Sequence, residues 1–216
     1  MYTLFFSFII SVSSISNTYS QSNANFLKGC MDTEDIDELN NAILSFENEY
    51  KRYYGKDLQS ISDELYKQYI QQVSDSEISP FFWTSDASVS ALDKMNDIGL
   101  FNRIWTRSSK VEIENNLPAI EMEEVIIGSP PPEEEDFDSF VINPKGTYAK
   151  CVLKNVRSPF LREYLKASFI IPDISPTIKS AGLLVAMEEA PYNSSILRTI
   201  VVIDLYYSMV VLIQKR

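Results

Sequence analysis

The chemistry open to this chain is that of carboxylates, because histidine is absent from its 216 residues. Without histidine the chain lacks the commonest general base, the Ser–His and Cys–His nucleophile pairs and most zinc or copper sites. Its six glycines form no phosphate-binding Gly-rich loop, and neither cysteine lies in a CxxC motif. We therefore assign no catalytic residue and expect no cofactor and no metal.

Paired carboxylates could still hydrolyse a polysaccharide, which requires two acids about 5–10 Å apart, one of them with a raised pKa. The chain holds 30 acids, so some pair will always look suitable and the pattern has no specificity. Glu47 and Glu49 lie among polar neighbours in one predicted helix, and Glu188 and Glu189 end another. We expect all four to face solvent.

Calcium is a second chemistry that the acids allow. The segment from Asp32 to Glu38 has the right ligand types but lacks the central glycine and the distal glutamate of an EF-hand loop. Acids also suit the first turn of a helix, where the helix dipole favours negative charge. We expect this segment to begin a helix. The run from Glu133 to Asp138 could hold cations loosely, without a specific site.

Tyrosines cluster in the region of the first two predicted helices. Tyr50, Tyr53 and Tyr69 lie on the apolar stripes, so we expect them in the core. Tyr54 and Tyr66 lie off the stripes, and tyrosine suits contact surfaces for proteins and sugars. We therefore name Tyr54 and Tyr66 as candidate interaction residues.

The net charge of −11 is local rather than general. Between Val111 and Pro144 there is no Lys or Arg, and without the ten acids of this stretch the chain keeps 20 acids and 19 basic residues. With no basic face to neutralise phosphates, nucleic-acid binding has no support. We name the acids near the end of the stretch as candidate contacts for a basic partner: Glu133, Glu134, Glu135, Asp136 and Asp138.

Residues 1–20 have the layout of a secretory signal peptide. An apolar stretch from Leu4 to Val12 is too short to span a bilayer and is followed by small residues that end at Ser20. The first segment contains no Lys or Arg, which leaves three alternatives open: a buried N-terminal element, an uncleaved anchor and a lipoprotein anchor at Cys30. We expect a secreted or periplasmic protein.

Cys30 and Cys151 are the two cysteines of the chain. In an exported protein an even number of cysteines favours a disulfide. The alternative is two separate buried thiols. We predict a Cys30–Cys151 bond that joins the two halves of the chain.

The N-terminal part predicts a helical hairpin over residues 32–73. The first helix runs from Asp32 or Thr33 to Gly55, and the second carries an apolar face from Leu58 to Val73. A short connection favours antiparallel neighbours. The apolar stripe of the first helix recurs at spacings of three and four residues: Ile36, Leu39, Ile43, Phe46, Tyr50 and Tyr53.

The middle of the chain is irregular. We expect Phe81, Phe82 and Trp83 to be buried and a helix to follow over residues 85–96, ending near Gly99. Residues 103–106 could pair with residues 111–114 as a hairpin. Residues 125–127 resemble a strand. After the acidic stretch, an apolar strip at residues 137–142 is expected to dock the chain again.

Residues 128–136 contain consecutive prolines followed by acids, which indicates an extended linker. This composition resembles the Pro/Glu linkers of bacterial envelope proteins, including TonB-like energy transducers. The resemblance covers under a tenth of the chain, and the C-terminal part does not resemble their αβ domain. We therefore assign no family.

The C-terminal part predicts a helical cluster. Residues 148–156 form one helix, and the Ser-Pro pairs at 158–159 and 175–176 each start another. Residues 196–213 are the most apolar of the mature chain. Arg198 and Asp204 would be costly in lipid, so we expect a buried central helix, with a strand or a membrane span as alternatives.

Together these patterns predict a mainly α protein with a short irregular, β-containing middle. Its parts are the signal peptide 1–20, a helical part 21–110, an acidic Pro-rich segment 111–146 and a helical part 147–216; as an alternative, 147–216 packs with 21–110 as one domain. We expect an exported, non-enzymatic binding protein whose partner is an unknown protein or surface, with no membrane association after cleavage. The alternatives are a carboxylate-only hydrolase of polysaccharide and a structural envelope component.

Overall fold

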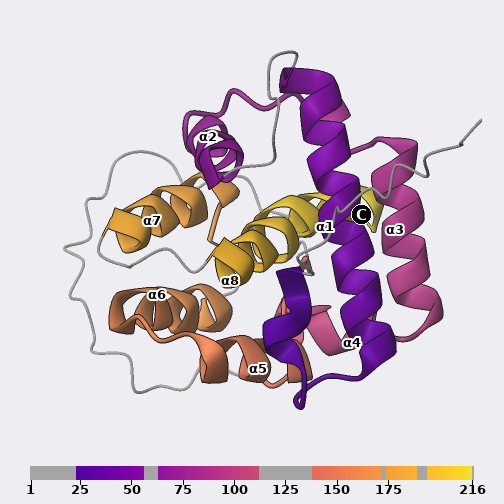
Figure 1. Cartoon of the computed structure of the whole chain (residues 1–216), viewed down its shortest axis with the longest axis vertical. Coiled ribbons are helices and arrows are strands. Elements are labelled where there is room, and N and C mark those ends of the chain that lie inside the picture. The colour runs from indigo at the N-terminus through magenta and orange to yellow at the C-terminus, as the bar shows by residue number, and fades with distance from the viewer. Residues whose placement is uncertain (1–22, 56–62, 112–137, 172–173, 189–193, 216) are drawn as a thin grey trace, which may run out of the picture.

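The computed structural model describes residues 23–55, 63–111, 138–171, 174–188 and 194–215 (Figure 1). Over these residues the protein is mainly helical, with one short two-stranded sheet, so the predicted fold class is confirmed. The signal peptide 1–20 and the acids Glu133, Glu134, Glu135 and Asp136 lie outside the described residues.

Helix α1 (Thr33–Tyr54) matches the predicted first helix. Asp32 precedes it and Gly55 follows it, but Gly55 has φ −113°, so the left-handed ending expected from the glycine is wrong. The apolar stripe is buried from Ile36 to Tyr50. Tyr53 is 42% exposed, against expectation, because the last turn extends beyond most of the core.

Helix α2 (Asp63–Ser74) does not lie along α1 as half of an antiparallel hairpin. It packs most extensively on α7 (Pro176–Glu188), whereas α1 packs along α3 (Asp86–Asp97) (Figure 1). Aromatic rings fill the space between α1 and α2: the ring centroids of Phe46 and Tyr69 are 5.0 Å apart, and those of Phe46 and Tyr66 are 5.7 Å apart. Large side chains thus keep the two backbones apart.

The segment before α3 is only partly buried. In the short 3-10 turn Pro80–Phe82, Phe82 is buried while Phe81 is 75% exposed, so burial of the whole aromatic triplet was wrong. Helix α3 itself matches its predicted limits. Ser85 caps it by accepting a hydrogen bond from the amide of Ser88, and Gly99 adopts φ +72° after its end.

The sheet pairs segments far apart in the sequence. After the short helix α4 (Phe101–Ile104), strand β1 (Trp105–Arg107) pairs antiparallel with β2 (Phe140–Ile142), in the register Thr106 opposite Val141. A 3-10 turn, Ser108–Lys110, follows β1. Residues 112–114 of the predicted local partner lie outside the described residues, whereas the docking of the 140–142 strip is as expected.

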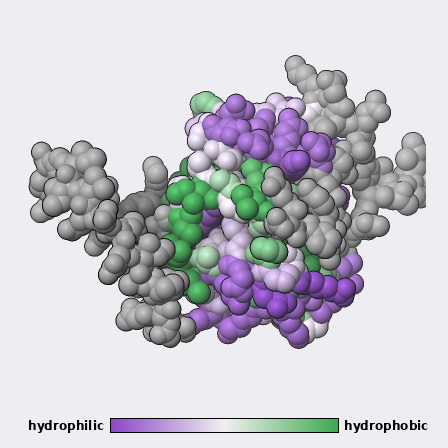
Figure 2. All heavy atoms as spheres, turned by 90° about the vertical axis from the view of Figure 1, so that its left-hand side faces the viewer, coloured by the Kyte–Doolittle hydropathy of each residue, from purple (hydrophilic) through white to green (hydrophobic). Residues whose placement is uncertain are grey.

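Two of the C-terminal helices begin at the Ser-Pro signals: α6 (Pro159–Ile170) and α7. Helix α5 (Thr147–Asn155) precedes them, and Ser158 caps α6 by accepting a hydrogen bond from the amide of Leu161. Helices α6 and α7 form one side of the molecule, where Phe160, Ile178 and Val185 are exposed. Figure 2, which views this side, shows hydrophobic surface between two hydrophilic regions.

The most apolar segment is a central helix, which confirms the favoured prediction. It consists of α8 (Ser194–Ile200), a π-helical stretch η4 (Val201–Tyr207) and α9 (Ser208–Gln214). The window Ser195–Gln214 is long and apolar enough to cross a bilayer, but 72% of it is buried inside the fold. Its composition is therefore explained by the core that it occupies.

The Cys30–Cys151 disulfide is present, as predicted. It joins the chain just before α1, after the 3-10 turn Asn23–Leu27, to α5, across 121 positions of sequence. Both halves contribute to one hydrophobic core, in which Leu39 and Phe46 of the N-terminal part share a cluster with Val202 and Tyr206. A bond that closes so long a loop stabilises a fold by roughly 4–5 kcal/mol on the chain-entropy model.

Candidate functional site

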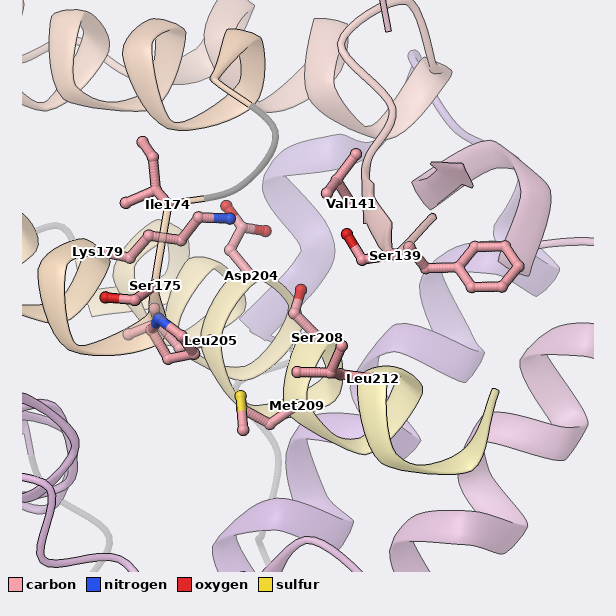
Figure 3. Close-up of a pocket in the computed structure, with 12 residues that line it drawn as sticks. Ser139, Val141, Ile174, Ser175, Lys179, Asp204, Leu205, Ser208, Met209 and Leu212 are labelled. Atoms are coloured by element: carbon pink, nitrogen blue, oxygen red, sulfur yellow. The ribbon is translucent and has the colours of Figure 1, made fainter. Parts of the chain in front are cut away.

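A cavity of about 230 Å³ lies between the beginning of α7, the central helix and β2 (Figure 3). Its lining combines an apolar wall with a small polar group. The polar residues are Ser139, Ser175, Lys179, Asp204 and Ser208; the apolar ones are Phe140, Val141, Ile174, Pro176, Leu205, Met209 and Leu212. A mostly apolar concavity with a few convergent polar groups is the usual form of a small-molecule site.

Asp204 is the acid of this cavity and is only 5% exposed. Its Oδ1 atom accepts a hydrogen bond of 2.8 Å from the hydroxyl of Tyr148 in α5. Its Oδ2 atom is buried and has no hydrogen-bond partner among the described residues. In Figure 3 the ammonium group of Lys179 points toward the Asp204 carboxylate. The carboxyl group that lines the cavity therefore has one oxygen whose hydrogen-bonding capacity is unused among the described residues.

Burial raises the pKa of Asp204 to about 7, although the hydrogen bond from Tyr148 and the positive charge of Lys179 both favour the ionised form. Burial also raises the pKa of Tyr148, and the nearby charge of Asp204 raises it further. The pKa of Tyr164 in α6 is raised for the same two reasons. Asp204 is thus an acid that changes its protonation near neutral pH, beside hydroxyls that stay protonated.

The π-helical stretch determines where Asp204 lies. Such stretches are rare and occur often at functional sites. The hydroxyl of Ser208 donates to the carbonyl of Ile203 at 3.3 Å and accepts from Nε1 of Trp105 at 3.3 Å. The turn that carries Asp204 is therefore joined to β1, on the side of the cavity where β2 also lies.

Sequence reasoning used Asp204 only as an argument against a membrane span. A single acid inside the most apolar segment was the signal that could have marked it, because an ionisable group is buried at a cost and is then often functional. The sequence does not show which residues lie beside Asp204, because Tyr148 and Lys179 belong to helices elsewhere in the chain.

A second feature is the base of the acidic stretch, where its two ends meet. Oδ1 of Asp138 accepts hydrogen bonds from the amide of Ser109 at 2.9 Å and from the hydroxyl of Ser108 at 3.2 Å. Arg107 donates to the carbonyl of Asp138 at 2.7 Å. We call residues 105–111 and 138–142 the neck. These contacts, the bond from the Ser109 amide above all, lower the pKa of Asp138.

The two candidate tyrosines are not free surface residues. Tyr66 is completely buried and its hydroxyl donates to Glu47 Oε1. Tyr54 is half-buried, and its hydroxyl accepts a hydrogen bond from the amide of Ser79 at 3.1 Å. Of the residues named from sequence as partner contacts, Asp138 is the one that the structure describes as exposed.

The expectation that Glu47 and Glu49 face solvent is wrong. Glu47 is 4% exposed and Glu49 is 8% exposed. Burial raises the pKa of Glu47, opposed by the hydrogen bond from Tyr66 and by the positive charge of Arg198. The reason is that α2 and the central helix cover faces of α1 beyond its apolar stripe. Glu188 and Glu189 have no described side chains.

The segment Asp32–Glu38 begins α1, as expected. Asp35 is 2% exposed and forms an ion pair of 2.8 Å with Arg103, which also approaches Asp32 to 3.8 Å. The described part of the chain holds no cluster of three or more potential metal ligands. The acids of this segment therefore connect α1 to α4.

The described residues do not assemble a two-carboxylate hydrolytic site in the cavity. Asp204 is the one acid among the described residues that line it, while Glu47 and Asp35 are buried elsewhere in contacts with Tyr66 and Arg103. The acid chemistry available in the cavity is hydrogen bonding and proton exchange by one carboxyl group.

Searches for similar proteins gave no identification. No protein family, no curated protein and no solved structure was found to match the chain.

Proposed function

We propose that this protein is an exported, non-enzymatic binding protein that contacts a basic partner through its acidic stretch. One observation carries the proposal: the neck holds both ends of the stretch together on a disulfide-bonded helical core. Binding residues in proteins are often presented in this way, on a loop that a rigid scaffold positions.

The charge distribution supports the same function. Ten acids and no basic residue lie between Val111 and Pro144, whereas the rest of the chain is almost neutral. A concentrated negative charge accelerates association with a positively charged partner and makes that association depend on ionic strength. The disulfide fits a location in the cell exterior or periplasm, where such bonds persist.

The cavity gives less support to catalysis. Hydrolysis of a polysaccharide by carboxylates needs two acids on opposite sides of the scissile bond, and Asp204 is the one acid that the described residues bring to the cavity lining. The envelope-component alternative relied on the apolar C-terminal segment as an anchor, and most of that segment is buried in the core.

The test compares two baits that differ only in charge. Wild-type protein and a variant with Glu133→Gln, Glu134→Gln, Glu135→Gln and Asp136→Asn are immobilised and exposed to the exported proteins of the source cells. We expect partners that wild type retains at low salt and releases at high salt, and that the variant does not retain.

The matched control neutralises four exposed acids on other parts of the surface: Glu64, Glu77, Asp93 and Asp97. It removes the same charge from the protein, so a loss of binding in both variants would show a general charge effect and contradict the proposal. Partners retained equally by all three baits, or unaffected by salt, would contradict it as well.

A further inference from the structure

We propose that the cavity beside Asp204 binds a small neutral molecule made of one apolar ring and a hydroxyl group, that is, a ligand of the phenol class. This site adjoins the neck through Ser139, Phe140 and Val141, its one described acid is Asp204 of the central helix, and it goes beyond the proposed partner binding. The two proposals can fail independently, because the ligand test below leaves the acidic stretch unchanged.

The first argument is the unused oxygen of Asp204. A buried polar atom that lacks a hydrogen-bond partner costs free energy, so such atoms are uncommon in native proteins and each requires an explanation. Oδ1 is occupied by Tyr148, whereas Oδ2 has no partner among the described residues. A ligand that donates one hydrogen bond to Oδ2 would give each oxygen of this carboxyl group a hydrogen-bond donor.

The second argument concerns the charge of the ligand group that donates this hydrogen bond. The ammonium of Lys179 points toward the Asp204 carboxylate from α7, and its charge favours the ionised form of this acid (Figure 3). A cationic ligand would therefore meet a second positive charge beside the same carboxyl group. A neutral hydroxyl donates the hydrogen bond without that repulsion, which makes an alcohol or phenol the better fit than an amine.

The third argument is the size and nature of the wall. Val141, Ile174, Met209 and Leu212 surround the polar group with apolar surface. The cavity of about 230 Å³ is smaller than most drug-sized pockets, yet larger than the roughly 150 Å³ cavity that accommodates a benzene molecule. One ring with a short substituent is the ligand that this space accepts.

Three probes of equal heavy-atom number test the assignment. They are p-cresol, its isomer anisole, which lacks a hydrogen-bond donor, and benzylamine, which is cationic at neutral pH. Isothermal titration of the full chain at pH 7.5 should show p-cresol binding about tenfold more tightly than anisole, since one hydrogen bond to a charged acceptor contributes at least that much. Benzylamine should bind more weakly than p-cresol.

Two variants locate the binding. Asp204→Asn keeps the acceptor for Tyr148 and places an amide donor at the position of Oδ2, so the preference for p-cresol over anisole should fall toward one. Leu212→Trp fills the cavity from a partly exposed position and should abolish binding of both probes. Circular dichroism confirms that each variant is folded, and if Asp204→Asn does not fold, the Leu212→Trp variant and the probe series decide.

The proposal is overturned if no probe binds up to its solubility limit, or if p-cresol and anisole bind wild type equally. It is also overturned if benzylamine binds most tightly, because the neutral head group is then wrong. Binding of p-cresol that survives Leu212→Trp in a folded protein would place the ligand elsewhere and overturn it too.

Discussion

Tyr148 donates a hydrogen bond of 2.8 Å to Asp204, although 56 positions separate the two residues in sequence. The bond joins α5, which carries the disulfide, to the π-helical stretch in the centre of the core. It occupies one oxygen of the carboxyl group, while the other oxygen has no hydrogen-bond partner among the described residues. Asp204 therefore belongs both to the core and to the lining of the candidate site.

Asp204 should make the protein less stable as pH rises toward neutrality. Its pKa is raised from 3.8 to about 7 in the folded state, so between these values the native protein holds a proton that the unfolded chain has lost. The free energy of unfolding therefore falls with increasing pH, by up to about 4 kcal/mol from this group at 1.36 kcal/mol per pKa unit. Urea denaturation at pH 5 and pH 8 measures the part of this fall that lies between these pH values, about 3 kcal/mol.

The control for this effect is Asp204→Asn, which cannot titrate. Tyr148, Tyr164 and Lys179 face the carboxyl group from α5, α6 and α7 and are unchanged in the variant. The variant should gain stability relative to wild type between pH 5 and pH 8. A constant difference across this range would contradict the raised pKa.

The disulfide should contribute a large share of the stability. Replacing Cys30 and Cys151 by alanine should lower the free energy of unfolding by about 4–5 kcal/mol, because the unfolded chain is then no longer constrained over a long loop. Urea denaturation of wild type with and without a reducing agent gives an independent measurement. Equal midpoints in both conditions would mean that the bond does not stabilise the fold.

Tyr66→Phe should destabilise the protein by about 1–3 kcal/mol, because it removes the hydroxyl that donates to the buried carboxylate of Glu47. Tyr53→Phe is the matched control: Tyr53 is 42% exposed, and the same chemical change there should alter stability by less than about 0.5 kcal/mol. Thermal denaturation of the two variants side by side distinguishes them. Similar effects would contradict the buried position of Tyr66.

Arg103→Met should be more harmful than removal of a surface cation. The buried carboxylate of Asp35 would then have no ion-pair partner. We expect the free energy of unfolding to fall by at least about 2 kcal/mol, which is less than for a fully buried pair because Arg103 is 34% exposed. The control Lys166→Met removes an ion pair with Glu163 in which both side chains are exposed, so the free energy of unfolding should fall by less than about 1 kcal/mol. Urea denaturation compares the two.

The helices were predictable where local signals decide their limits. Ser158-Pro159 and Ser175-Pro176 each start a helix, and the spacing of apolar residues identified α1. These signals depend only on residues within one or two turns, so tertiary contacts do not alter them.

Burial of the acids was not predictable in the same way. The pattern of a single helix shows its most apolar face, but not how many neighbours cover the remaining faces. Glu47 is buried because α2 brings Tyr66 to it, and Asp35 is buried because α4 brings Arg103. The pairing of β1 with β2 was not predictable for a related reason, since β2 begins more than thirty residues after β1 ends in the sequence.

The neck brings two points of the chain, Ser109 and Asp138, into contact although 29 positions of sequence separate them. For a flexible chain between two such fixed points, the entropy of closure grows only by about 0.6 kcal/mol for each doubling of its length. We therefore expect that residues added or exchanged between Ser109 and Asp138 cost the described helical core little stability. Evolution could exchange partners here without redesigning the fold, and an engineer could insert a foreign peptide at the same place.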